Sequence, residues 1–262
     1  RWVGTRTGRL EPAAERFPMA TECRAVIPSS TRARDGTSLE ERVEWTFSTP
    51  PLRLENVRPS EGPVGLEPLF YMEFNQKIEP EAVLEHVRVW GGGRMYSPRR
   101  AAEQRLERDE TVAKLARKAP EGHWLAFYLP RPLKPGTDYQ FGLTEAAPSA
   151  EGGRTTRENH YMQFRTYDPL AVEKSECGWR QCWPGTPWVF EFNNPIDAET
   201  VDASSVRVEP ELEEKSVEVH HNRVFVRGET RPETTYEVTL RDTIRDTFGQ
   251  WLEKPHESTF DI

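Results

Sequence analysis

The sequence lacks the features that mark several common protein classes. Its 262 residues contain no run of about 18 apolar residues, the length that a membrane-spanning helix requires. Lysine and arginine number 35 against 43 aspartates and glutamates, and no basic stripe with interleaved aromatic residues occurs. No signal-peptide pattern is present. We therefore predict no transmembrane segment in this stretch of chain and no nucleic-acid partner.

Motifs of the common catalytic and metal sites are also missing. The sequence has no phosphate-binding loop, no Gly-x-Ser-x-Gly, no His-Glu-x-x-His and no EF-hand loop. Its histidines are scattered, and the neighbours His220 and His221 would point to opposite faces of a strand, which makes a poor chelate. We predict no catalytic residue, no metal ligand, no cofactor and no enzymatic activity.

Cysteine is scarce, with three residues in the chain. The spacing of Cys177 and Cys182 permits a small disulfide-closed loop in an oxidising compartment, and two buried thiols are the alternative. No second cysteine or histidine pair accompanies them, so a zinc site lacks ligands. Cys23 fits best as a small apolar residue on a strand.

An internal repeat organises what is present. Residues 45–49, 162–166 and 258–262 each alternate apolar and polar side chains and each place a phenylalanine in a strand. Residues 74–83 also match residues 192–201, through the shared pattern Phe-Asn-x-x-Ile, and a strand-like alternating stretch precedes each copy.

The repeat predicts three units, with boundaries at residues 1–51, 52–167 and 168–262. Complete units of this length, in a chain with 22 prolines and 17 glycines, favour small β-sandwiches. The first unit contains only the second half of the pattern, so we expect the C-terminal part of a sandwich and a chain that is a piece of a longer protein. The residues predicted to form the repeated core are Phe74, Tyr139, Phe164, Phe192, Tyr236 and Phe260, with Cys23 at the position of the two tyrosines.

One segment breaks the strand pattern. Ser97 followed by Pro98 is typical of a helix start, and apolar residues between positions 102 and 119 fall at helical spacings. Residues 109–111 either interrupt this helix or begin a second one. We predict a helical insertion near residues 97–119 that packs on the middle sandwich, with a partner-binding helix as the alternative.

Two kinds of polar or aromatic residue suggest possible sites. Asn75 and Asn193 both end a strand before a turn, and we expect their side chains to cap the local backbone, a shared ligand site being the alternative. Trp179 lies inside the possible disulfide loop and is the candidate for an exposed partner contact, whereas Trp188 alternates with Phe190 and Phe192 and is expected in the core.

The order of these features resembles a known family. The Phe-Asn-x-x-Ile-x-Pro-Glu-Ala-Val sequence of residues 74–83 resembles a bacterial immunoglobulin-like module. The helical insertion, the Leu133–Thr137 turn, the Glu151-Gly152-Gly153 segment and the cysteine loop that leads into residues 190–197 together resemble the N-terminal region of bacterial alpha-2-macroglobulin-like proteins.

The resemblance implies an all-β fold of tandem immunoglobulin-like β-sandwiches. It implies a non-catalytic array in a large exported protein, a lipoprotein or a secreted protein, that traps proteases, and it favours the disulfide because such proteins enter an oxidising compartment. The Cys-x-Glu-Gln thioester motif of many members is absent here. The expected partners are other domains of the parent chain, proteases or another envelope protein. Two alternatives remain: a cell-surface adhesin or stalk that binds protein or polysaccharide, and an accessory module of a secreted carbohydrate-active enzyme.

Overall fold

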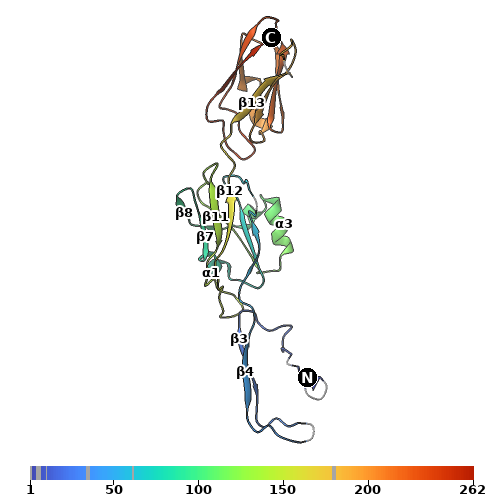
Figure 1. Ribbon diagram of the computed structural model, residues 1–262, viewed down its shortest axis with the longest axis vertical. Helices are drawn as coiled ribbons and strands as arrows, with labels where there is room; N and C mark the ends of the chain where they lie inside the picture. Colours follow the sequence, from blue (N-terminus) through green and yellow to red (C-terminus); the bar gives the residue numbers. More distant parts are fainter. Residues whose placement is uncertain (1, 4–6, 10, 34–35, 61, 179–180) are drawn as a thin grey trace. The chain divides into compact units, whose positions relative to one another are not determined.

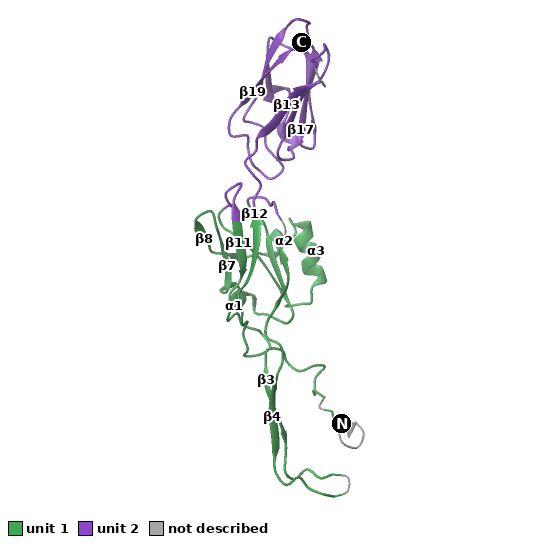
Figure 2. Ribbon diagram, viewed as in Figure 1, with its two compact units in different colours: residues 1–61, 67–131, 139–164 green, residues 62–66, 132–138, 165–262 purple. Residues whose placement is uncertain are grey.

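The computed structural model describes residues 2–3, 7–9, 11–33, 36–60, 62–178 and 181–262 (Figure 1). It is an all-β protein of tandem immunoglobulin-like β-sandwiches with a few short helices. The chain divides into two compact units: unit 1 contains residues 1–61, 67–131 and 139–164, and unit 2 contains residues 62–66, 132–138 and 165–262 (Figure 2). None of the described helices is long and apolar enough to cross a bilayer.

The sandwich of unit 1 consists of two four-stranded sheets. One has the strand order β5-β6-β10-β9 and the other the order β12-β11-β7-β8. The strands are β5 (Leu54–Arg58), β6 (Phe70–Phe74), β7 (Val87–Gly91), β8 (Arg94–Tyr96), β9 (Arg99–Arg100), β10 (Trp124–Tyr128), β11 (Asp138–Leu143) and β12 (His160–Arg165). Aromatic rings fill the space between the sheets, because Phe70 of β6 lies 5.0 Å from Phe141 and 5.8 Å from Phe164, ring centre to ring centre.

Short helices cover the outer face of the first of these sheets. They are α2 (Glu103–Leu106) and α3 (Glu110–Lys118), and α1 (Pro80–Leu84) follows β6. Val112 of α3 is buried with Tyr71, and Leu106 and Leu115 pack against the same cluster. Tyr71 alternates with Phe70 and Met72, so β6 is buried on both faces and needs this cover.

The start of the helical insertion differs from the prediction. Ser97 does not cap a helix, because Arg99 and Arg100 form the edge strand β9, which pairs with β10. The tertiary pairing with β10 outweighs the local Ser-Pro signal. Asp109 begins the second helix instead, and its side chain accepts a hydrogen bond of 3.0 Å from the Val112 amide.

The first part of unit 1 contains two hairpins. A short one pairs β1 (Trp2–Val3) with β2 (Thr7–Gly8), and a longer one pairs β3 (Glu22–Ile27) with β4 (Val43–Ser48). The register of the longer hairpin places Cys23 opposite Phe47, Ala25 opposite Trp45 and Ile27 opposite Val43. These residues share one face of a two-stranded sheet, and Trp45 remains 46% exposed.

Unit 2 contains the second sandwich, with strand orders β13-β14-β17-β16 and β15-β18-β19. Its elements are β13 (Val172–Cys177), β14 (Trp188–Phe192), η1 (Ala198–Thr200), η2 (Ala203–Ser205), β15 (Val206–Glu209), β16 (Glu213–His220), β17 (Arg223–Glu229), β18 (Thr235–Leu240) and β19 (His256–Asp261). Trp188 and Phe190 alternate inward from β14, and the Trp188 ring stacks on Phe260 of the opposite sheet at 5.1 Å. The sandwich therefore closes around aromatic side chains as unit 1 does.

Candidate interaction site

The disulfide loop of unit 2 connects β13 to β14. Cys177 ends β13 opposite Trp188, the first residue of β14, and it forms a disulfide with Cys182 across a Cα–Cα distance of 5.1 Å. Gly178 adopts a φ of +62°, and a Cβ atom there would lie 2.6 Å from the carbonyl oxygen of Gln181. The tight loop thus depends on glycine immediately after the first cysteine.

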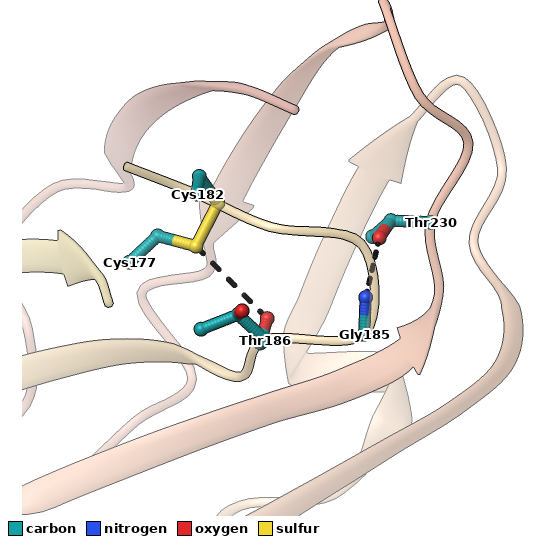
Figure 3. Close-up of a disulfide and its surroundings, with 5 residues drawn as sticks. All are labelled: Cys177, Cys182, Gly185, Thr186 and Thr230. Atoms are coloured by element: carbon teal, nitrogen blue, oxygen red, sulfur yellow. Dashed lines mark hydrogen bonds between the residues drawn. A yellow bond between two sulfur atoms is a disulfide. The ribbon is translucent and has the colours of Figure 1, made fainter. Parts of the chain in front are cut away.

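Backbone contacts hold the second half of this loop. The Gly185 amide donates to the Thr230 hydroxyl at 2.9 Å, and the Thr186 carbonyl oxygen lies 4.0 Å from the Cys177 sulfur (Figure 3). Trp188 is 1% exposed, as expected of a core residue, whereas Trp183 is 63% exposed. Trp179, the predicted partner contact, lies outside the described residues. From the sequence, Trp183 belongs to the aromatic cluster around the cysteine loop, and Trp179 was preferred to it as the exposed contact, although the Pro184-Gly185 turn after Trp183 is a signal for a loop.

The predicted repeat-core residues are all buried, at most 7% exposed. They are Phe74, Tyr139 and Phe164 in unit 1 and Phe192, Tyr236 and Phe260 in unit 2. In unit 1 the rings of Tyr139 and Phe164 stack at 5.5 Å, and in unit 2 Tyr236 lies directly opposite Phe260 in register. Tyr139 also contacts Tyr96, and the two hydroxyls lie 3.4 Å apart. Burial, followed by this hydrogen bond, raises the pKa of Tyr96 to about 12.

Asn75 and Asn193 perform the same task in the two sandwiches. The Asn75 side chain accepts from the Arg53 amide at 2.9 Å and donates to the Pro51 carbonyl oxygen at 3.3 Å. Asn193 accepts from the Ala171 amide at 2.9 Å and donates to the Pro169 carbonyl oxygen at 2.8 Å. The prediction that each side chain caps the backbone next to it in sequence is therefore wrong. Each asparagine instead binds the backbone of the segment that enters its own sandwich. We call this the lead-in segment (residues 50–53 in unit 1 and 168–171 in unit 2).

A buried polar cluster around Asp246 also binds the second lead-in segment. Asp246 is fully buried, and its carboxylate accepts from the side chains of Asn194 at 2.8 Å and Gln250 at 3.0 Å. The backbone amides of Phe248 and Gln250 donate to its other oxygen at 3.0 and 2.8 Å. Both amide side chains also donate to the carbonyl oxygen of Asp168, each at 3.1 Å. With four donors the buried carboxylate is satisfied, so the cluster stabilises the fold and offers no vacant ligand position.

In unit 1, the Glu151 carboxylate joins segments that are far apart in the sequence. Its carboxylate forms an ion pair with Arg16 at 2.7 Å and accepts from the amides of Met19 at 3.2 Å and Lys77 at 3.0 Å. The hydrogen bond from Arg16 is the main reason why the pKa of Glu151 falls to about 2. The next residue, Gly152, has no room for a side chain, because a Cβ atom would lie 2.4 Å from the Ala20 carbonyl oxygen. This loop fastens the segment before β3 to the sandwich, a role that the sequence pattern did not reveal.

The polar groups of these sites are paired within their own units. Within the described ranges, no group of three or more histidine, cysteine, aspartate or glutamate side chains is placed to hold a metal ion. The polar clusters at Asp246 and Glu151 satisfy their own charges through backbone amides and neighbouring side chains. Large aromatic side chains are also exposed, and Trp183, which follows the disulfide, is one of them.

The chain is similar to several known proteins. No protein-family model matches the sequence. An alpha-2-macroglobulin homolog from Nostoc sp. (strain PCC 7120) is 25% identical over 218 residues, which cover 76% of this chain and 11% of that protein. The chain therefore spans about a tenth of the length of that relative.

Two solved structures are similar to it at low identity and with low TM-scores. Native alpha-2-macroglobulin from Escherichia coli, spanning domains MG0-NIE-MG1, is 11% identical over 81% of this chain and 71% of that one, with a TM-score of 0.32. The N-terminal part of the bacterial S-layer protein SbsC is 10% identical over 80% of this chain and 44% of that one, with a TM-score of 0.28.

Proposed function

We propose that this chain is a non-catalytic structural and interaction array within an exported, alpha-2-macroglobulin-like protein whose other domains trap proteases. The similarity to the Nostoc alpha-2-macroglobulin homolog over 76% of the chain supports the parent class. The role of these modules is to space and orient neighbouring domains. Protease-trapping chemistry then resides elsewhere in the parent.

One observation carries the scaffold role: both sandwiches hold their lead-in segment with the same pair of asparagine hydrogen bonds. The bonds from Asn75 reach Arg53 and Pro51, and those from Asn193 reach Ala171 and Pro169, at the same sequence separations of 22 and 24 residues. A hydrogen-bonded lead-in leaves the backbone fewer orientations as it enters each sandwich. A module that serves as a spacer benefits from such a defined direction.

The disulfide supports an oxidising compartment for the parent protein. Disulfides persist in oxidising environments, and the bond between Cys177 and Cys182 fits a protein of the periplasm, the outer cell surface or the medium. We place the parent there, as a membrane-anchored lipoprotein or a secreted protein.

The β3–β4 hairpin supports a third sandwich. Cys23 and Phe47 pair in the register that Tyr236 and Phe260 have in β18–β19. In unit 2 this pair is covered by Trp188 of the opposite sheet, with ring distances of 5.3 and 5.1 Å. We propose that residues 1–51 are the closing part of a further sandwich, whose opposite sheet would cover the exposed Trp45.

The experiment that tests the trapping assignment uses the full-length parent protein. The parent is mixed with trypsin, and residual activity is compared on a small chromogenic peptide and on a bulky protein substrate. A trap encloses the protease, so the proposal predicts retained activity on the peptide and lost activity on the protein. If the parent leaves both activities unchanged, or blocks both equally, it is not a trap of this class.

A further inference from the structure

The two outer faces of the unit 1 sandwich differ in how their apolar side chains are covered. On the β5-β6-β10-β9 sheet, α2 and α3 cover Tyr71 and its neighbours. On the β12-β11-β7-β8 sheet, no described helix lies over the outer side chains, and Figure 1 shows α3 on the side away from β7 and β8. Two large side chains remain exposed on this second face, Met95 at 65% and Tyr161 at 41%.

These side chains form one continuous surface, which we call the aromatic face (Arg88, Trp90, Arg94, Met95 and Tyr161). Trp90 is a direct cross-strand neighbour of Met95, and its ring stands perpendicular to that of Tyr161 at 4.7 Å. A shallow groove of about 710 Å³ runs along these residues. The five come from β7, β8 and β12, so the sheet itself holds them in place.

Gly142 of β11 makes room for this arrangement. A Cβ atom at this position would lie 2.7 Å from the Tyr161 ring and 1.9 Å from the His160 carbonyl oxygen. The glycine therefore lets the Tyr161 ring lie close against the sheet and approach Trp90.

Unit 2 shows that the fold does not require aromatic residues here. Val87 and Val89 of β7 pair with Leu143 and Phe141, as Val206 and Val208 of β15 pair with Leu240 and Val238. This common register makes Glu209 the equivalent of Trp90. The alignment of Phe164 with Phe260 makes Glu257 the equivalent of Tyr161. Both glutamates are exposed, so the same sheet face is polar in unit 2.

Because Trp90 replaces the glutamate found in unit 2, the neighbouring arginine of unit 1 has no carboxylate in the described part of the chain to pair with. In unit 2, Arg207 forms an ion pair with Glu209 on the same strand. Its equivalent, Arg88, donates instead to the carbonyl oxygens of Glu85 at 2.6 Å and Val87 at 2.9 Å. Arg94 lies over the Tyr96 ring at 5.5 Å. No carboxylate of the described ranges forms an ion pair with Arg88 or Arg94, so two cations flank an apolar groove on a chain whose net charge is −8.

We propose that the aromatic face binds a polypeptide segment that presents an apolar side chain flanked by carboxylates. Tryptophan, tyrosine, methionine and arginine are the residues enriched at protein interfaces, and large binding contributions concentrate on the first two and arginine. The partner's apolar side chain fills the groove over Trp90, Met95 and Tyr161. Its carboxylates pair with Arg88 and Arg94, as the Glu209 carboxylate pairs with Arg207 in unit 2.

The test uses the whole chain and a displayed library of random peptides. Peptides selected on the wild type are measured individually on a double variant, Trp90→Glu with Tyr161→Glu, which introduces the residues that unit 2 carries. The control is the reverse exchange in unit 2, Glu209→Trp with Glu257→Tyr. We expect the selected peptides to combine aspartate or glutamate with leucine or an aromatic residue. Their affinity should fall about 30-fold on the first variant and stay unchanged on the control.

If the double variant shows no thermal unfolding transition and is therefore not folded, the same test is made with two single variants, Arg88→Glu and Met95→Glu. Binding should also weaken as salt is raised, because the arginines contribute electrostatic attraction. Selected peptides that are basic, or that bind wild type and variants equally, would overturn the proposal. Self-association of the wild type that disappears in the double variant would also overturn it, because the face would then bind a second copy of the chain. Binding of an uncharged polysaccharide in place of peptide would overturn it as well.

Discussion

Asn75 and Asn193 illustrate how far single residues could be read from the sequence. Their place at the end of a strand in both repeats marked them as backbone-binding residues, and they do bind backbone. The partner could not be read, because it lies 22 residues earlier in a segment with no motif of its own. Asp246 and Glu151 carried no signal at all, since acidic residues are common in this chain and only the fold shows which of them is buried.

We expect Asn75→Ala to lower the free energy of unfolding of unit 1, and Asn193→Ala that of unit 2, by about 1–2 kcal/mol, because each change leaves a backbone donor and acceptor without their partner. Thermal and urea denaturation measure the loss. The matched Asn→Asp variants keep the acceptor and lose the donor, so they should fall between alanine and wild type. Alanine variants as stable as wild type would show that the lead-in segments are not held by these bonds.

A pH dependence follows from Glu151. Its pKa is lowered in the folded protein from 4.5 to about 2, so the folded state prefers the ionised carboxylate. The stabilisation is complete above pH 4.5 and is lost as the pH falls from there towards 2. Because Arg16 is 50% exposed, solvent screening limits its size, and we expect about 1–3 kcal/mol.

Urea denaturation of Glu151→Gln measures this contribution. The variant should be less stable than wild type at pH 7, and the gap should narrow as the pH approaches 3. Glu158→Gln, which alters an exposed glutamate of the same unit, serves as the control and should match wild type throughout. A gap that is constant with pH would mean that charge at Glu151 is not what fastens the segment before β3.

At the scale of elements, strands were more predictable than the helical insertion. Strand-like patterns in residues 69–74 and 187–192 indicated β6 and β14. In β14 the buried side chains fall at every second position, whereas β6 is also buried on its outer face, under the helices. The Ser97-Pro98 pair misled, since the pairing of Arg99 and Arg100 with β10 is a contact between residues far apart in the chain. Asp109 at the second helix start was one of the two possibilities that the sequence left open.

The β3–β4 hairpin yields a prediction about local stability. In β18–β19 the inward residues Tyr236, Val238 and Leu240 are at most 1% exposed, whereas the equivalent face of β3–β4 includes Trp45 at 46%. An isolated two-stranded hairpin is marginally stable in water. Amide hydrogen exchange of Cys23, Ala25 and Ile27 should therefore be far faster than that of their equivalents in β18. Equal protection would mean that the hairpin needs no covering sheet and would contradict a third sandwich.

At the scale of the whole molecule, the internal repeat was the most informative property of the sequence. It aligned Phe74 with Phe192 and Phe164 with Phe260, and these residues are buried in both units. The same alignment sets Trp90 against Glu209, so the contrast between the two outer faces was present in the sequence. Its meaning needed the structure, because only the sheet register shows that Trp90, Met95 and Tyr161 meet on one surface.

At this scale, we propose that the modules are scaffold and do not act on proteases themselves. The measurement that tests it most directly incubates the chain with trypsin, chymotrypsin and subtilisin in the presence of a bulky protein substrate. If the modules are scaffold, the substrate is digested at the same rate with and without the chain. Substantial protection of the substrate at near-stoichiometric amounts of the chain would contradict it, and would assign an inhibitory role to these modules.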